Sequence, residues 1–396
     1  MKSFKFYSPT RIFFGDDQEK DFAEQLCSLG KKGVIITGGG SVERLGYLER
    51  VLAATKSAGI VLTHFSGIEA NPISSTVNKI AKEIGAGEVD FVIALGGGSV
   101  MDASKAISFM LKAGEDDIWP FVAGEKRAGE INQALPIVCI PTTAATASEV
   151  TPFAVISNPE RHGKAPIAHD CLKPTLSWIN PAFTVELPDV TTRDGAADIL
   201  SHVFENYILG GDSAPVTDRY CEGIIRTVVE TLPELGHHPG NLALRGSMLW
   251  CSTLALNGMQ TAGRNQAPFV LHAMEHALSG FQHDLAHGRG LATLYPSYFK
   301  WLLSKDRACE RFAQLNHRVF DKESSADGFV SNFSTWLKEN QLYQSLYDLG
   351  FEKKDFSSIA AEVMRVNAGE ERVLDVLGPM TEQDIVEIFE GTATQQ

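Results

Sequence analysis

The chain has 396 residues, of which 44% are hydrophobic and 21% charged, and its formal net charge at pH 7 is −14. This length exceeds what one hydrophobic core usually supports, so we expect a globular protein with two domains. No apolar run is long enough to cross a bilayer, and the acidic balance argues against general nucleic-acid binding. Six cysteines without a Cys-x-x-Cys pair disfavour a disulfide framework and a thiolate zinc site; they are Cys27, Cys139, Cys171, Cys221, Cys251 and Cys309.

The first residues, MKSFKFYSPTRIFFG, show neither an apolar signal core nor an Arg- and Ser-rich transit pattern, so we expect a cytoplasmic protein. Residues 4–15 are predicted to form two short strands around a Ser-Pro-Thr turn, as an edge hairpin or a subunit contact. A homodimer through these strands is the default expectation.

Short β-branched runs then alternate with helical patterns, which is typical of βαβ units and a parallel sheet. After about residue 186 the strand signals stop, and apolar residues recur at three- and four-residue spacing to the end. We therefore predict an α/β nucleotide-binding domain over residues 1–186 and an all-α domain over residues 187–396. The predicted strands are GVIIT (33–37), GIVLTHF (59–65), DFVIAL (90–95) and LPIVCI (135–140).

The pentapeptide GGGSV occurs twice, and its second copy follows the predicted strand 90–95 and opens a helix. Glycines at such a junction let the backbone approach a phosphate, and the free N–H groups of the helix start attract its charge. Ser99 and Asp102 stand at the spacing of a capping box, which would define that helix start. A tight turn that binds nothing is the alternative. The residues predicted to meet the pyrophosphate are Gly96, Gly97, Gly98 and Ser99.

The first copy follows the predicted strand 33–37, and its turn offers no carboxylate until Glu43. An acidic residue near such a strand end commonly bonds the ribose 2′-hydroxyl and repels a 2′-phosphate, so its absence favours NADP over NAD. Neither copy fits the Gly-x-Gly-x-x-Gly fingerprint. A third small-residue turn, PTTAATASE, adds Thr142, Thr143 and Ser148 as hydroxyl donors. The residues of the first turn predicted to contact the nucleotide are Gly38, Gly39, Gly40 and Ser41.

Histidines gather in the helical half, four of them in HAMEHALSGFQHDLAHG. Helical spacing places Asp198 with His202, and His272 with His276, as two i,i+4 pairs that could face one ion. Oxygen and imidazole donors suit Zn²⁺ or Fe²⁺. Spacing alone does not decide which of the four histidines His272, His276, His283 and His287 are ligands.

Four segments, in order along nearly the whole chain, resemble the iron-containing alcohol dehydrogenase family. The resemblance implies a dehydroquinate synthase-like architecture with a divalent metal in the cleft between an α/β and a helical domain. It implies His276 close to the nicotinamide and substrate, and Asp102, Thr142, Thr143 and Lys164 at the nucleotide. The implied metal ligands are Asp198, His202, His272 and His287, with His283 as the competitor of His287. The segments are GGGSVMDASK, PTTAATASEVTPFAV, DGAADILSHVFENYI and HAMEHALSGFQHDLAHGRGLATLYP.

The resemblance implies a metal-dependent alcohol dehydrogenase or aldehyde reductase that transfers hydride between NADP(H) and a primary alcohol or aldehyde. Its first turn looks like that of the NADP-dependent butanol dehydrogenases and aldehyde reductases of the family. Three alternatives stay open: an NAD-dependent alcohol or polyol dehydrogenase, a dehydroquinate synthase-like lyase, and a binding protein without turnover. The remaining histidines, His64 among them, are given no role.

Overall fold

The computed structural model describes residues 1–211, 214–368 and 373–395. They form two compact units, each made of separate segments of the chain. Unit 2 is the α/β unit, and the helical unit is unit 1; the predicted order of an α/β region and then a helical region is confirmed. Unit 1 comprises Met1–Tyr7, Pro188–Pro239 and Trp250–Gln396, and unit 2 comprises Ser8–Leu187 and Gly240–Leu249.

Six parallel strands form the sheet of unit 2, in the order β1, β8, β5, β4, β2, β3. The chain therefore winds from β2 to β3 in one direction, and then returns past β2 so that β4 lies on its other side. The adjacent strands β2 and β4 flank this switch point. The strands are β1 (Arg11–Phe14), β2 (Lys32–Ile36), β3 (Val61–Phe65), β4 (Phe91–Gly96), β5 (Ile137–Pro141) and β8 (Leu176–Ile179).

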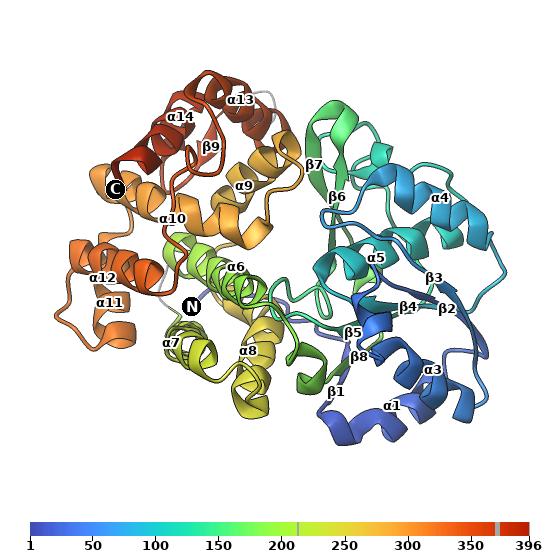
Figure 1. Cartoon of the computed structure of the whole chain (residues 1–396). Helices are drawn as coiled ribbons and strands as arrows, with labels where there is room; N and C mark the ends of the chain where they lie inside the picture. The colour runs from blue at the N-terminus through green and yellow to red at the C-terminus, as the bar shows by residue number, and fades with distance from the viewer. Residues whose placement is uncertain (212–213, 369–372, 396) are drawn as a thin grey trace. The chain divides into compact units, whose positions relative to one another are not determined.

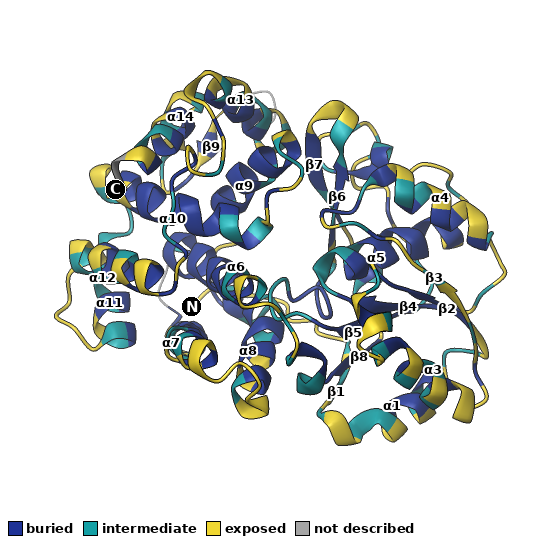
Figure 2. Ribbon diagram, in the orientation of Figure 1, coloured by how far each residue is buried: buried dark blue, intermediate teal, exposed yellow. Residues whose placement is uncertain are grey.

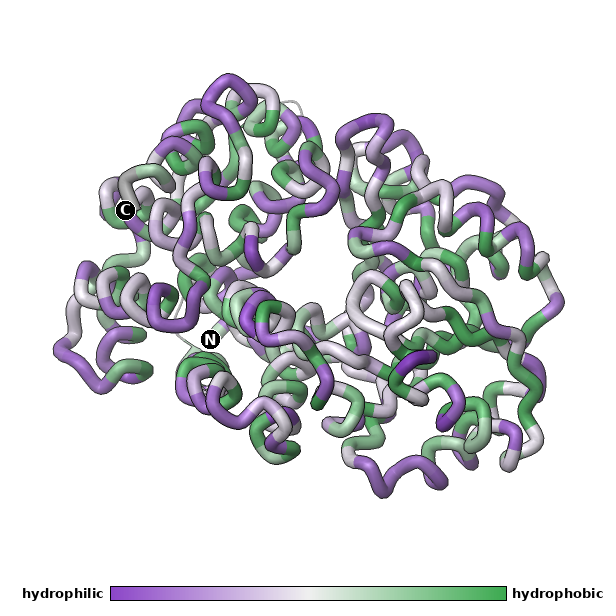
Figure 3. Tube along the Cα trace, in the orientation of Figure 1, coloured by the Kyte–Doolittle hydropathy of each residue, from purple (hydrophilic) through white to green (hydrophobic). Residues whose placement is uncertain are grey.

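Helices cover both faces of this sheet, α1 and α3 on one side and α4 and α5 on the other (Figure 1). Because both faces are covered, the central strands are hydrophobic along their length, and much of the sheet is green in Figure 3. The register aligns Ile35, Ile93, Val138 and Leu176 in one row, which belongs to the core packed against α1 and α3. These helices are α1 (Glu19–Leu26), α3 (Tyr47–Ser57), α4 (Ser74–Ile84) and α5 (Gly98–Ala113).

The predicted hairpin over residues 4–15 is wrong. Only β1 forms there, at the edge of the sheet, and its backbone pairs in parallel with β8. The preceding segment Met1–Tyr7 belongs to unit 1, where Lys2 N donates to Gly263 O at 2.8 Å. The two halves of the expected hairpin therefore belong to different units. A hairpin that was not predicted, of β6 (Phe153–Asn158) and β7 (Gly163–Ala168), lies between β5 and β8 in the chain.

Helices make up most of unit 1, and α6 is buried from Gly195 to Leu209, the part drawn dark blue in Figure 2. Its Phe204 makes edge-to-face contacts with Tyr295 and Phe299 of α10 and with Phe329 and Phe333 of α12, at centroid distances of 5.2–5.8 Å. This aromatic core holds α6 against α10. The helices are α6 (Asp189–Leu209), α7 (Pro215–His237), α9 (Val270–Phe281), α10 (His287–Ser304), α11 (Cys309–Phe320), α12 (Ala326–Glu339), α13 (Phe356–Asn367) and α14 (Glu382–Gly391).

Helix α8 (Leu242–Ala255) starts in the short segment of unit 2 and ends in unit 1. In unit 2, Gly246 of this helix lies close to Pro181 and Phe14. A two-residue antiparallel pair, β9 (Leu374–Asp375) and β10 (Pro379–Met380), completes the regular structure of unit 1. Among the described residues, no helix has both the length and the apolar character needed to span a membrane. The division of the chain into functional domains at residues 186 and 187 stays a prediction.

Candidate metal and nucleotide sites

A cluster of one aspartate and three histidines lies inside unit 1. Asp198 and His202 are successive-turn neighbours on α6, His272 lies on α9, and His287 is the first residue of α10. The side chains of Asp198, His202 and His272 are at most 8% exposed, whereas that of His287 is 22% exposed. Three helices thus bring together the four side chains that the sequence analysis named as ligands.

The three imidazoles converge on one atom, Asp198 Oδ1. The Nε2 atoms of His202, His272 and His287 lie 3.6, 3.7 and 3.5 Å from it. These distances exceed a normal hydrogen bond, and Asp198 Oδ1 is buried without a hydrogen-bond partner among the described residues. An ion with bonds of about 2.0–2.1 Å holds tetrahedral ligands about 3.4 Å apart, close to the three distances from Asp198 Oδ1. The donor atoms of Asp198, His202 and His272 lie within 4.8 Å of one another, and His287 joins them through Asp198. The cluster therefore fits a divalent ion.

Two further carboxylates lie behind the histidines. His272 Nδ1 donates to Glu205 Oε2, and His287 Nδ1 donates to Glu275 Oε2. Because a carboxylate only accepts, both rings must carry hydrogen on Nδ1, which leaves Nε2, the atom that faces Asp198, as the nitrogen that binds a metal ion once it carries no proton. Glu205 also accepts from Leu271 N at 2.6 Å, and Glu275 accepts from Ser279 Oγ. This is the usual carboxylate support for metal-binding histidines.

Charges within the cluster shift its proton affinities. Burial would raise the pKa of Asp198, but the nearby imidazoles of His202, His287 and His272 outweigh it and hold that pKa below its usual range. Burial lowers the pKa of His202 to about 3, so this ring is neutral at pH 7, the form that binds metal ions. Burial alone would lower the pKa of His272, but the negative charge of Glu205 outweighs this effect and raises that pKa to about 9.

Two glycines position His287 at the start of α10. A Cβ on Gly288 would lie 1.8 Å from the backbone oxygen of Asp194, so only glycine lets α10 start this close to α6. A Cβ on Gly290 would lie 2.8 Å from Cγ of Glu275, the carboxylate that supports His287. The sequence HGRG therefore places the imidazole of His287 between α6 and the side chain of Glu275.

The two other histidines of the segment occupy different places. His276 is half-buried on α9, and its ring centroid lies 5.4 Å from that of His287. Glu275, His276 and His287 form a second group whose donor atoms lie within 4.8 Å, but Glu275 is already bonded to His287 and Ser279. Among the described residues, His283 belongs to neither group of clustered donor atoms.

In unit 2, the two GGGSV turns follow β2 and β4, the strands that flank the switch point. Ligands of open α/β sheets bind at the carboxyl ends of the strands at such a point. The turns also approach each other, because a Cβ on Gly38 would lie 3.5 Å from Cγ2 of Val100. The second turn packs on the third, since a Cβ on Gly97 would lie 3.1 Å from Thr143 Oγ1 and one on Gly98 would lie 2.5 Å from Thr146.

The predicted capping box of Ser99 and Asp102 is wrong. Helix α5 begins at Gly98, Gly97 is its N-cap, and no side chain caps it. Ser99 Oγ instead accepts from Asn71 N at 3.2 Å. Asp102 is too deep in the first turns of the helix to cap it, and its two oxygens accept from Ser148 Oγ and Val155 N at 2.7 and 2.8 Å. Asp102 therefore ties α5 to the third turn and to β6.

Lys105 and Lys164 surround this aspartate with positive charge. The buried amine of Lys105 donates to Ser148 Oγ and to backbone oxygens of Thr151 and Phe153 at 2.7–2.9 Å. Burial raises the pKa of Asp102, and the charges of Lys105 and Lys164 act against this rise. Lys164 is 7% exposed and lies on β7, and Thr142 and Thr143 directly follow β5. All predicted nucleotide residues thus belong to unit 2.

The first turn carries a carboxylate after all. Glu43 lies on the single-turn helix α2 (Ser41–Arg44), which follows Gly40 at φ +95°. Its Oε1 accepts from Thr37 Oγ1 at 2.9 Å and lies 3.3 Å from His64 Nε2. Thr37 directly follows β2, so the carboxylate folds back to the end of that strand.

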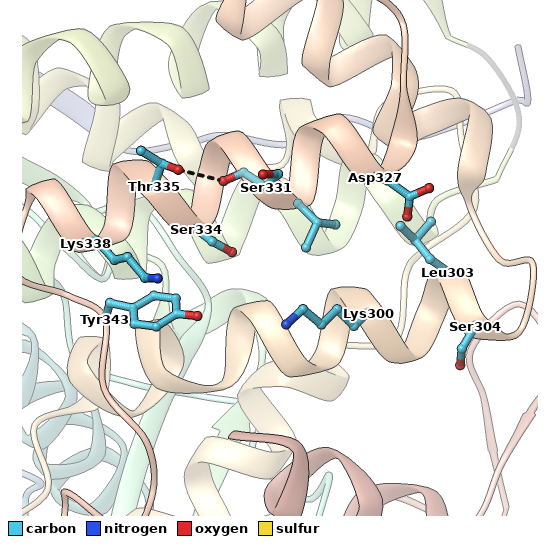
Figure 4. A pocket seen from close by; sticks show the side chains of 10 residues that line it. Lys300, Leu303, Ser304, Asp327, Ser331, Ser334, Thr335, Lys338 and Tyr343 are labelled. Atoms are coloured by element: carbon cyan, nitrogen blue, oxygen red, sulfur yellow. Dashed lines mark hydrogen bonds between the residues drawn. The ribbon is translucent and has the colours of Figure 1, made fainter. Parts of the chain in front are cut away.

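A hollow of about 580 Å³ between α10 and α12 contains none of the predicted site residues (Figure 4). Lys300, Lys338 and Tyr343 line it with hydroxyl-bearing side chains of α12. The Lys338 amine lies 4.4 Å from the ring centroid of Tyr343. The hollow is therefore separate from the histidine cluster.

Comparison with known proteins matches both halves of the chain to one family. Residues 9–181 match the family described as iron-containing alcohol dehydrogenase, and residues 192–393 match the C-terminal part of the Fe-containing alcohol dehydrogenase family. The chain belongs to the iron-containing alcohol dehydrogenases. The predicted family is thereby confirmed.

Relatives of this iron-containing alcohol dehydrogenase use either nucleotide, according to their names. NADH-dependent butanol dehydrogenase A of Clostridium acetobutylicum is 32% identical over 98% of this chain and 99% of that protein. The NADPH-dependent aldehyde reductase YqhD of Escherichia coli is 33% identical over 83% of this chain and 82% of that protein. The crystal structure of NADH-dependent butanol dehydrogenase A from Thermotoga maritima has a TM-score of 0.92 and 31% identity, with 99% of both chains covered.

Membership confirms the predicted fold class and enzyme class. The chain is an NAD(P)-dependent alcohol dehydrogenase, an oxidoreductase that works with a metal ion and a nicotinamide nucleotide.

Sequence reasoning missed four residues that the structure adds to these sites. Glu205 lies seven residues after Asp198 and three after His202, so helical spacing already placed it on the same face of α6. Glu275 gave no such signal, since its partner His287 comes from the next helix. Thr37 directly follows β2 and His64 lies on β3, and only the parallel pairing of β2 with β3 brings them together.

Proposed function

We propose that this alcohol dehydrogenase acts as a metal-dependent aldehyde reductase, exchanging hydride between NAD(P)H and primary aldehydes or alcohols. The convergence of three imidazole nitrogens on Asp198 Oδ1 carries the proposal, because it supplies one oxygen and three nitrogen donors around one point. Such a donor set suits Fe²⁺ or Zn²⁺. The names of the relatives, butanol dehydrogenase and aldehyde reductase, support the substrate class.

Asp198, His202, His272 and His287 would hold the ion. A bound divalent ion supplies Lewis-acid polarisation of a carbonyl oxygen, and the reduced nicotinamide supplies the hydride. Glu205 and Glu275 fix the rings of His272 and His287 with Nε2 turned toward Asp198. Their negative charge also makes these imidazoles better donors to a cation.

His276 is proposed as the proton carrier. It stands one helical turn after His272 on α9, half-buried, and its ring stacks at 30° on that of His287. Reduction of an aldehyde consumes one proton, and an imidazole that solvent can reach is able to supply it near neutral pH. The role of His276 is to pass that proton from water to the alcohol oxygen.

On the nucleotide side, we propose that both GGGSV turns serve one dinucleotide. In the first turn, Gly39 has no atom within 4 Å of the position of a Cβ, so a ligand can approach its backbone, and the second turn opens the sixteen-residue helix α5. Its free N–H groups suit the pyrophosphate. Thr142, Thr143 and Lys164 join this site in the proposal.

The sequence-based preference for NADPH stays a prediction. It rests on the lack of a carboxylate within the first turn, whereas the structure places the carboxylate of Glu43 at the end of β2. The names of the relatives divide between NADH and NADPH. A homodimer and a cytoplasmic location likewise stay predictions.

The ligand set is tested with two matched variants from one segment, His287→Ala and His283→Ala. We expect His287→Ala to purify with little bound metal, and its butanal reduction to fall more than about 100-fold, beyond what loss of an outer partner causes. His283→Ala is expected to keep both metal and turnover. Metal content, measured by mass spectrometry, shows whether His287 or His283 binds the ion. Full metal occupancy in His287→Ala would overturn the assignment of His287 as a ligand.

A further inference from the structure

Thr37, Glu43 and His64 form a small polar cluster at the carboxyl ends of β2 and β3. Thr37 Oγ1 donates to Glu43 Oε1 at 2.9 Å and lies 2.8 Å from His64 Nε2. The Thr37 hydroxyl has a single hydrogen, which it donates to Glu43. The same hydroxyl oxygen therefore accepts a hydrogen bond from the Nε2–H of His64. Glu43 is therefore held by Thr37, directly after β2, and by His64 of β3.

The second carboxylate oxygen of Glu43, Oε2, is buried and has no hydrogen-bond partner among the described residues. A buried carboxylate oxygen without a donor is unfavourable, and it becomes favourable when a hydroxyl or amide supplies one. The side chain of Glu43 as a whole is 31% exposed, so rotation of the carboxylate can offer this oxygen to a hydrogen-bond donor of a ligand.

The location indicates which ligand. The cluster adjoins the first GGGSV turn at the switch point between β2 and β4, where open α/β sheets bind their nucleotides. Gly39 in that turn has no atom within 4 Å of the position of a Cβ, so a ligand can approach its backbone closely. An acidic side chain at such a strand end accepts from a ribose 2′-hydroxyl, and its charge repels a phosphate at the same position.

We propose that Glu43 is the residue that selects the nucleotide, and that it makes this enzyme favour NADH over NADPH. Thr37 and His64 are positioning residues for its carboxylate. The inference rests on the proposed function, because it assumes that the first turn meets the adenosine ribose. It replaces the expectation from sequence alone, which favoured NADP because the first turn offers no carboxylate until Glu43.

The test compares kcat/KM for NADH and NADPH in metal-loaded wild type and Glu43→Gln, with butanal as substrate. Glutamine keeps the shape of the side chain and an oxygen for Thr37 but removes the charge. Wild type is expected to prefer NADH about tenfold or more, and Glu43→Gln to lose about tenfold or more of that preference, mainly through a lower KM for NADPH. Glu49→Gln, which removes an exposed charge from α3, serves as control and is expected to leave the ratio unchanged.

Thr37→Val and Thr37→Ser separate positioning from mere structural support. Valine removes the hydroxyl that anchors Glu43, so the preference for NADH is expected to fall, whereas serine keeps the hydroxyl and the preference. An unchanged nucleotide ratio in both Glu43→Gln and Thr37→Val, or a wild type that prefers NADPH, would overturn the inference and leave aldehyde reduction standing.

Direct binding distinguishes failure of this inference from failure of the proposed function. The dissociation constants of NADH and NADPH are measured by nucleotide fluorescence, without aldehyde, on wild type and Glu43→Gln. A shift in the ratio of these constants together with no aldehyde turnover would support the role of Glu43 and refute the proposed reaction. Binding of neither nucleotide would refute both.

Discussion

Among single residues, Glu275 shows how a buried carboxylate prepares a histidine for a metal ion. It is fully buried, and it accepts from His287 Nδ1 while His287 Nε2 faces Asp198. Glu205 does the same for His272. Such pairs raise the basicity of the ligand and fix its ring, so the support residues matter to affinity although they do not touch the ion.

Glu275→Gln is accordingly expected to weaken metal binding by about 10–100-fold while the protein stays folded. The amide keeps the volume of the side chain, but it loses the negative charge that faces His287. Competition with a chelator of known affinity measures the change, and circular dichroism checks the fold. Glu310→Gln, an exposed change on α11, is the matched control. Equal metal affinity in all three proteins would contradict the role given to Glu275.

Site residues that lie close together in the sequence could be predicted from their spacing. Site residues that only tertiary packing brings together could not. Asp198 with His202 follows from one turn of one helix, and the resemblance of the HAMEHALSGFQHDLAHG segment supplied His272 and His287. From the sequence, no carboxylate was expected in the first turn until Glu43. Gly40 at φ +95° reverses the chain and brings that carboxylate back to Thr37. Nothing in the linear order shows that reversal.

At the scale of elements, the site depends on the close approach of α10 to α6. Gly288 lies against the backbone of Asp194, where a Cβ would come within 1.8 Å of a carbonyl oxygen. Backbone atoms cannot rotate away as a flexible side chain can, so a larger residue must displace the start of α10. His287 is the first residue of that helix and would move with it.

Gly288→Ala is therefore expected to destabilise the protein by about 1–3 kcal/mol or more and to reduce metal binding. Gly223→Ala, within α7, is the matched control, since no atom lies within 4 Å of its Cβ position. That change is expected to stabilise the protein by about 0.5–1 kcal/mol, because alanine is the better helix former. Denaturant unfolding of both variants measures the difference. A Gly288→Ala protein as stable as wild type would contradict this packing.

The elements themselves were predictable where periodicity was strong. The strands β2, β3, β4 and β5 coincide with the β-branched runs, because a parallel sheet covered on both faces leaves a continuous apolar signature. The hairpin of β6 and β7 was not predicted, since only the antiparallel pairing of GKAPIA with FAVISN makes GKAPIA a strand. The expected hairpin at residues 4–15 failed because its first half packs on unit 1.

On the scale of the whole molecule, buried thiols in both units are held in their neutral form. Burial raises the pKa of Cys139, Cys221 and Cys251 from 9.0 to about 12 in each case. Cys27, Cys171 and Cys309 are partly exposed. Because only the thiolate reacts with alkylating reagents, the two groups should differ in reactivity in the folded protein.

We expect iodoacetamide at pH 8 to label Cys27, Cys171 and Cys309 in the native protein and all six cysteines only after unfolding. Mass spectrometry of the labelled peptides checks this expectation. Native-state labelling of Cys139 as fast as that of Cys27 would contradict the packing of its surroundings.

The raised pKa values of the buried thiols also set the sign of a pH effect on stability. The stability that these neutral thiols contribute is present below pH 9.0 and is lost as the pH rises toward about 12, because only the unfolded thiols ionise there.

The central claim is that the cluster around Asp198 holds a metal ion on which aldehyde reduction depends. The most direct measurement strips the protein of metal with a chelator, adds back Zn²⁺ or Fe²⁺, and follows butanal reduction with NADH and with NADPH. We expect almost no turnover in the stripped protein and recovery with one ion per chain, with NADH the better nucleotide. Full activity of the stripped protein, or no reduction with either nucleotide at full metal occupancy, would contradict it.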